Sequence, residues 1–286
     1  MHKDPCEKCQ NAYDYTCYLV DIQIVIIVLG SLLTVGLFSS FGFQIKKMYD
    51  NKSTDGISFQ MLHLALYNQW SQFINFFMSQ FPQVMSCGNT FWKCISNIIP
   101  QINSIFCFIG FLIQYLQYLY YQYKEERFSS LFKRNFVLST IFLCYVSVTL
   151  PGLIISGLNY SVCDQTFRTF TLIFAIISMC CAFVQWIPQI VITQKIKNVG
   201  SFSIISLCIN VPGQLISLIT LIMSKDGWST WIINIVQLIL LIYLLILLIR
   251  YTYCEPYKTK NQQNGDGVIQ QQEYLVENTN TTDLRN

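Results

Sequence analysis

The sequence contains little charge for its length. Asp, Glu, Lys and Arg make up 12% of its 286 residues, whereas apolar residues make up 53%. An ordinary soluble domain carries about twice that share of charge, so most of this protein's surface cannot face water. The net charge is only +3 and forms no basic patch, which gives no reason to expect a nucleic-acid partner.

Seven stretches lack Asp, Glu, Lys and Arg altogether. They cover residues 22–45, 56–92, 94–123, 135–163, 169–194, 198–224 and 227–249. Each is at least as long as the roughly 20 residues that an α-helix needs to cross a bilayer. We therefore predict an all-α integral membrane protein with seven transmembrane helices. A large soluble helical protein would need charged helix faces, which these stretches do not have.

The basic residues indicate how the chain is oriented in the membrane. Thirteen Lys and Arg residues fall on one side of the membrane, in residues 46–55, 124–134, 195–197 and 250–286. Five fall on the opposite side. Because basic residues stay in the cytosol, we expect residues 1–18 to be luminal or extracellular and residues 252–286 to be a disordered cytosolic tail. Residues 1–18 are too polar for a cleavable signal sequence, so the first span is expected to act as a signal-anchor.

A weak internal repeat relates the two halves of the chain. When the sequence is shifted by 145 positions, residues 43–59 align without a gap on residues 188–204. Four of the seventeen positions are identical, namely Gln44/Gln189, Ile45/Ile190, Lys52/Lys197 and Ser58/Ser203. Both copies lie where one hydrophobic span ends in a short basic loop and the next begins, which is typical of a duplicated unit.

The repeat predicts the order of the spans. Residues 19–120 and 167–251 each hold three spans, and residues 135–158 form a span with no counterpart in the repeat. Two copies with parallel topology need an odd number of crossings between them. We therefore predict two parallel three-helix bundles joined by one linker helix, a 3+1+3 arrangement.

Polar side chains inside the spans are the candidate binding or gating residues. The second span is unusually rich in amides, and an amide-bearing helix face is not expected to face lipid. In the other half, prolines in two consecutive spans lie beside glutamines and can bend their helices. The candidates are Gln44, Asn68, Gln69, Pro188, Gln189, Asn210 and Gln214. Under the repeat, Gln69 aligns with Gln214, which predicts two amides facing each other across a central cavity.

The Pro-Gln step followed by a basic loop resembles the PQ-loop family. That family includes cystinosin, the lysosomal and vacuolar cationic amino acid exporters and, more distantly, the SWEET sugar facilitators. The most similar pieces are Lys-Ser-Thr-Asp-Gly-Ile-Ser at 52–58 and Pro188-Gln189-Ile190. The resemblance implies a small-solute transporter in a lysosomal or vacuolar membrane. It favours an amino acid over a sugar as the solute. No cofactor or metal is implied, and a homodimer is left open.

The sequence departs from the family pattern at positions that bear on mechanism. Phe43 stands where the first Pro-Gln would have its proline, and the second loop is degenerate. No Asp or Glu lies in any span, although a membrane-embedded carboxylate is the usual proton carrier. Tight proton coupling is therefore disfavoured, and His63 is the one candidate proton carrier, although a lone histidine in a polar helix is more often simply hydrogen-bonded.

Two other classes of protein were weighed against a transporter. A seven-helix receptor or scaffold without transport activity would also fit the number of spans, but an internal three-helix repeat is not expected of a receptor. An enzyme is disfavoured because the sequence shows no nucleophile–base pair, phosphate-binding glycine loop or metal-ligand cluster.

Overall fold

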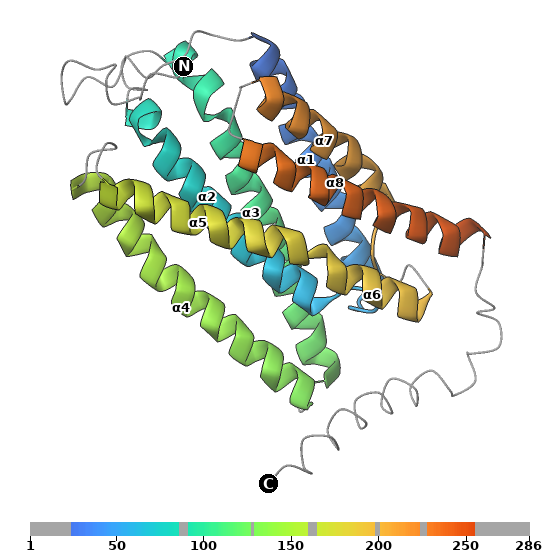
Figure 1. Ribbon diagram of the computed structural model, residues 1–286. Helices are drawn as coiled ribbons and strands as arrows, with labels where there is room; N and C mark the ends of the chain where they lie inside the picture. The colour runs from blue at the N-terminus through green and yellow to red at the C-terminus, as the bar shows by residue number, and fades with distance from the viewer. Residues whose placement is uncertain are drawn as a thin grey trace, which may run out of the picture.

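The computed structural model describes residues 24–85, 91–126, 129–159, 165–197, 201–223 and 228–254. In these ranges every regular element is a helix (Figure 1). The helices are α1 (Ile24–Asn51), α2 (Phe59–Met85), α3 (Phe91–Glu126), α4 (Ser130–Asn159), α5 (Gln165–Val184), α6 (Trp186–Ile196), α7 (Ile204–Met223) and α8 (Trp228–Ile249), followed by the π-helix η4 (Arg250–Cys254). The predicted segment 1–18, and the predicted tail beyond residue 254, lie outside the described residues.

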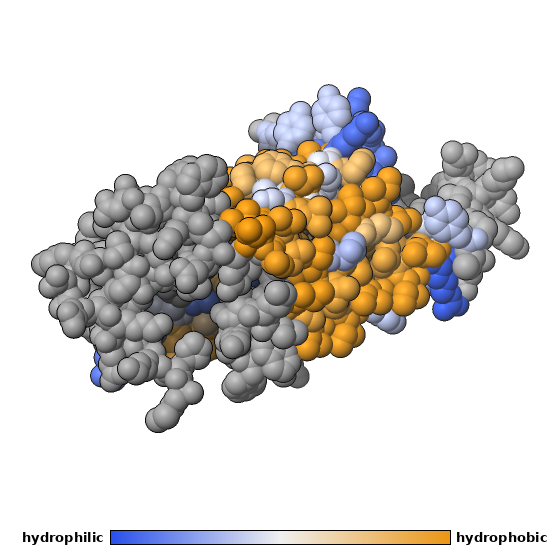
Figure 2. Space-filling view, turned by 90° about the horizontal axis from the view of Figure 1, so that it is seen from above, coloured by the Kyte–Doolittle hydropathy of each residue, from blue (hydrophilic) through white to orange (hydrophobic). Residues whose placement is uncertain are grey.

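Five helical segments among the described residues are long and apolar enough to cross a membrane. They are Ile27–Asn51, Gln101–Lys124, Ser130–Ile155, Thr169–Ile196 and Asn234–Tyr253. Helix α7 holds a shorter apolar segment, Ile204–Ile219, and α2 is long enough but carries too many polar residues to be counted. Figure 2 shows apolar residues over most of the coloured surface in that view. The predicted multi-pass, all-α membrane class is therefore confirmed.

Helices α5 and α6 form one rod that is interrupted at a single residue. Gln185 separates them, yet its backbone is helical (φ −56°, ψ −35°), and its N–H donates to the carbonyl of Cys181 at 2.9 Å. Pro188 lies three residues after Gln185 and has no N–H to offer the carbonyl of Val184. The predicted fifth span is thus a rod of two helices that lacks one helical hydrogen bond beside Pro188.

The helices pack in an order that repeats in the two halves. Helix α3 contacts both α1 and α2, and α8 contacts both α7 and the α5–α6 rod. Between the halves, α1 packs against α7, and α2 packs against α5 and α6. Helix α4 contacts α2 and α3 and lies at the edge of the bundle, away from α7 and α8 (Figure 1).

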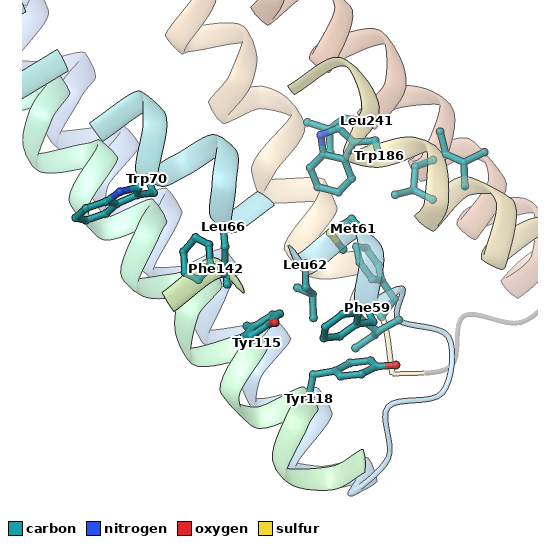
Figure 3. Close-up of a cluster of buried hydrophobic side chains, with 14 of the residues drawn as sticks. Phe59, Met61, Leu62, Leu66, Trp70, Tyr115, Tyr118, Phe142, Trp186 and Leu241 are labelled. Atoms are coloured by element: carbon teal, nitrogen blue, oxygen red, sulfur yellow. The ribbon is translucent and has the colours of Figure 1, made fainter. Parts of the chain in front are cut away.

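The apolar core follows α2. Figure 3 shows Phe59, Leu62, Leu66 and Trp70 along this helix. The ring of Phe59 lies 5.4 Å from that of Tyr115, the distance being measured between ring centroids. Because α2 is surrounded by α3, α4, α5 and α6, its side chains are buried on several faces, which is how a helix with many amides can stay inside a membrane protein.

Gly110 allows α3 to pack closely against α1, and it provides a test of this interface. A Cβ added at Gly110 would lie 2.5 Å from the ring of Phe41, whereas one added at Gly42 would meet no atom within 4 Å. Gly110→Ala is therefore expected to destabilise the protein by about 1–3 kcal/mol. Gly42→Ala is the matched control and should leave stability unchanged or slightly higher. Thermal unfolding in detergent measures both, and equal effects would contradict this packing.

Candidate functional site

The two basic loops begin with the same backbone turn. Lys52 and Lys197, which are 145 residues apart, have φ angles of 49° and 50°. Each donates its backbone N–H over 3.0 Å to a carbonyl four residues earlier, that of Met48 or that of Thr193. Left-handed residues of this kind commonly end α-helices. The repeat predicted from four identities therefore extends to backbone geometry.

The helices that follow the loops also begin in the same way. The hydroxyl oxygen of Ser58 accepts a hydrogen bond from the backbone N–H of Met61, and that of Ser203 accepts one from Ser206, both over 3.2 Å. Serine is a strong N-cap because it satisfies an N–H that the helix itself cannot. Ser58 begins α2 and Ser203 begins α7, so the matched serines of the repeat have matched structural roles.

Gln44 and Gln189 join the two halves through these loops. Gln44 donates from Nε2 to the carbonyl of Ser201 (3.1 Å), and its Oε1 accepts from the backbone N–H of Ser203 (2.7 Å). Gln189 donates to the carbonyl of Gly56 (2.7 Å) and accepts from the backbone N–H of Ser58 (2.9 Å). We call these four hydrogen bonds the glutamine clamp. We call the end of the bundle where they lie the loop side.

The glutamine clamp is reciprocal and buried. Each glutamine binds the loop of the opposite half, and the two bonded positions, 56 and 58 or 201 and 203, are again 145 residues apart. Gln44 is 3% exposed and Gln189 is fully buried. A primary amide can donate and accept at once, so it can bridge a carbonyl and an N–H two residues apart. The four bonds tie each loop to a helix of the opposite half.

A second polar contact between the halves lies deeper, between α2 and the α5–α6 rod. Asn68 donates from Nδ2 to Oε1 of Gln185 (3.0 Å), and its Oδ1 accepts from the hydroxyl of Ser178 (2.7 Å). Asn68 and Gln185 are 2% and 3% exposed. The predicted site residue Asn68 therefore faces the opposite half of the chain, at the break between α5 and α6.

The remaining amides of the predicted site occupy different surroundings. Gln214 donates to Oδ1 of Asn234 (2.7 Å) and Oε1 of Gln237 (3.2 Å), both on α8 of its own half. Gln69 and Asn210 are half-buried. The structure thus brings Gln44, Gln189 and Asn68 to the contact between the halves, and it shows no contact between Gln69 and Gln214.

His63 lies among aromatic side chains between α2, α3 and α4. Its Nδ1 is 3.2 Å from the hydroxyl of Tyr115, which is 2.6 Å from the hydroxyl of Ser139 on α4. Its ring stacks against Phe59 and meets Tyr67 edge-on. The linker helix α4 therefore contributes a polar partner to this group, which the sequence interpretation did not foresee.

Several residues of the site were missed at the sequence level. Gln185 has Ser40 at the corresponding position of the repeat, so self-alignment could not single it out. Ser40 instead approaches Ser206, with 2.7 Å between the two hydroxyl oxygens, at the α1–α7 contact. The signal that could have found both residues is their spacing of four from Gln189 and Gln44, which places them on the same helix face as the clamp.

Comparison with known proteins identifies one segment of the chain. Residues 170–230 match the family model described as the PQ loop repeat. This segment contains the α5–α6 break, Gln189 and the second basic loop. The same comparisons matched no curated protein and no solved structure.

Proposed function

We propose that this chain, in which residues 170–230 match the PQ loop repeat, is a PQ-loop protein that carries a small solute across a membrane by alternating access. The observation that carries the proposal is the glutamine clamp, because it closes one end of the bundle through bonds that can be exchanged for water when that end opens. Transport requires such a reversible closure on each side of a central binding site.

The proposal includes the 3+1+3 arrangement. Helices α1, α2 and α3 form one bundle, α5–α6, α7 and α8 form the other, and α4 is the linker. The packing supports this, since the third helix of each trio lies against the other two, and the contacts α1–α7 and α2–α5 exchange under the repeat. The reciprocal bonds of Gln44 and Gln189 support a twofold-like relation between the bundles.

Amino acids are the solutes we propose. Amide groups both donate and accept, which suits a zwitterion better than a bare cation, and the predicted spans hold no Asp or Glu. Asn68, Gln69, Asn210 and Gln214 are proposed to bind the solute, and Gln44, Pro188 and Gln189 to gate its path. By resemblance to the exporters of cationic amino acids, we place the protein in a lysosomal or vacuolar membrane, with the loop side in the cytosol.

Uptake into proteoliposomes tests the proposal. Radiolabelled amino acids and sugars are screened with and without a pH gradient, and we expect at least one amino acid to accumulate above protein-free vesicles. Gln69→Ala and Gln214→Ala should each lower its uptake. If both leave uptake unchanged, the binding role of these amides is wrong. If no solute enters, the protein is better described as a receptor or scaffold.

His63 gives a prediction about proton coupling. Its imidazole bonds to Tyr115 and is enclosed by aromatic rings, and no carboxylate in the part of the chain that the structure describes is bonded to it. We therefore propose that it positions Tyr115 and carries no proton during transport. His63→Gln should retain the wild-type ratio of uptake with and without a pH gradient. A variant in which the gradient dependence disappears, while uptake itself persists, would show that His63 couples transport to protons.

A further inference from the structure

The second basic loop forms side-chain hydrogen bonds that have no counterpart in the first basic loop. Ser201 stands at the repeat position of Gly56, and its hydroxyl donates to the carbonyl of Ser53 (2.9 Å) and accepts from Nδ2 of Asn51 (3.3 Å). Its backbone N–H donates to the carbonyl of Asp55 (2.7 Å). Ser201 is 1% exposed. Serine at this position therefore adds side-chain bonds that a glycine has no atoms to form.

The end of α1 supplies a further bond to the same loop. Nζ of Lys47 donates to the carbonyl of Phe202. We call Lys47, Asn51 and Ser201 together the loop latch. Their counterparts 145 positions away are Ile192, Ile196 and Gly56, whose side chains have no donor or acceptor. The loop latch thus ties α1 to the second loop, and no equivalent bonds can tie α6 to the first loop.

The same asymmetry appears in the two helices that enter the loops. Helix α1 is continuous from Ile24 to Asn51, and it has Phe43 at the position that corresponds to Pro188. The α5–α6 rod is interrupted at Gln185, and three residues later Pro188 cannot donate the helical hydrogen bond to Val184. Proline-broken helices bend more readily than continuous ones. The helix that contributes no residue to the loop latch, α6, is therefore also the one that follows the hinge.

We infer that the loop side opens as a one-armed gate. Helix α6 swings about Gln185 and Pro188 and withdraws Gln189 from the loop 52–58, while α1 stays bound to the second loop through the loop latch. A symmetric rocking motion would break both halves of the glutamine clamp together. The role of the motion in solute passage rests on the proposed function, but the motion itself does not.

Spin labels at matched positions distinguish the two motions. Lys46 on α1 and Ile205 on α7 are exposed, and this pair reports on the contact that the loop latch holds. Gln60 on α2 and Val191 on α6 are also exposed, and this pair reports on the contact that Gln189 makes. The repeat relates the two pairs, because Lys46 corresponds to Val191 and Gln60 corresponds to Ile205. Labels are introduced as non-canonical amino acids so that the twelve cysteines stay in place. Distances within each pair are measured by pulsed electron paramagnetic resonance in the full chain in nanodiscs.

The test compares Gln189→Ala with Gln44→Ala. Removing Gln189 is expected to produce a second, longer distance for the 60–191 pair, with the 46–205 pair unchanged. Removing Gln44 is expected to leave the 46–205 pair at its wild-type distance, because the loop latch still holds. If Gln44→Ala lengthens its pair as much as Gln189→Ala does, or if neither variant lengthens any distance, the one-armed gate is wrong.

Two further sets of variants keep the inference testable. If the alanine variants fold poorly, Gln44→Asn and Gln189→Asn shorten the side chain while keeping its amide. The loop latch is removed by replacing its residues with those at the counterpart positions, as Lys47→Ile, Asn51→Ile and Ser201→Gly. When Gln44→Ala is added to this variant, the distance of the 46–205 pair should become longer. An unchanged distance would overturn the role of the loop latch. If the distances change as expected but the protein transports no solute, the proposed function is refuted and the one-armed gate is not.

Discussion

Replacing both Gln44 and Gln189 by leucine is expected to reduce solute uptake to background. The substitution removes all four hydrogen bonds of the glutamine clamp. In the one-armed gate, opening breaks the two bonds of Gln189 and keeps those of Gln44. At about 1 kcal/mol net for each bond, the loop-closed state therefore loses about 2 kcal/mol relative to the open state. Because about 1.4 kcal/mol corresponds to a tenfold change in an equilibrium constant, the ratio of closed to open molecules should fall about thirtyfold. Uptake of radiolabelled solute into proteoliposomes measures the effect.

A third glutamine supplies the matched control. Gln194 also lies on α6, but it is exposed and donates to the hydroxyl of Tyr243 at 2.9 Å. Gln194→Leu removes a glutamine hydrogen bond without leaving buried backbone groups unpaired, so uptake should stay close to that of the wild-type protein. If the double variant at 44 and 189 transports as well as Gln194→Leu does, the glutamine clamp has no part in the transport cycle.

Pro188→Ala is expected to stabilise the protein and to slow solute uptake. Alanine supplies the N–H that the carbonyl of Val184 lacks, which should add about 1 kcal/mol to the free energy of unfolding. A straighter, stiffer α5–α6 rod would then resist the bending that opening requires, and we expect the initial uptake rate to fall about tenfold or more. Thermal unfolding and uptake are measured on the same preparation.

Pro151 serves as the comparison for this substitution. It also lies inside a helix, α4, but outside both repeats, and it is exposed. Pro151→Ala should raise stability by a similar amount because it restores the same kind of hydrogen bond. It should leave uptake unchanged. Equal slowing by both substitutions would mean that general stiffening, and not a hinge at Pro188, limits the rate.

The helical membrane class could be predicted because it depends on simple quantities. A bilayer requires about 20 apolar residues in each spanning helix, and the stretches without charge met that requirement. The boundaries were less accurate: the first helix continues to Asn51, beyond the end of the charge-free stretch at residue 45, because its last turn lies at the loop side among polar partners. Charge-free length therefore finds spans better than it finds their ends.

The candidate site was predicted in part. The repeat singled out Gln44 and Gln189 as a matched pair, but it could not show that each binds the loop of the other half. That contact joins residues about 130 to 160 positions apart, and only the packing of α1 on α7 and of α2 on α5 and α6 brings them together. Self-alignment also hides differences between copies, so the bonds of Lys47 and Ser201 had no signal in it.

The most direct test of the account is whether the glutamine clamp opens while the protein works. Wild-type chain labelled at Gln60 and Val191 is reconstituted in liposomes, and the distance between the labels is measured with an accepted solute on both sides and again without any solute. The account predicts that a longer distance becomes populated when solute is exchanging. A single unchanged distance under conditions where radiolabelled solute is taken up would contradict it.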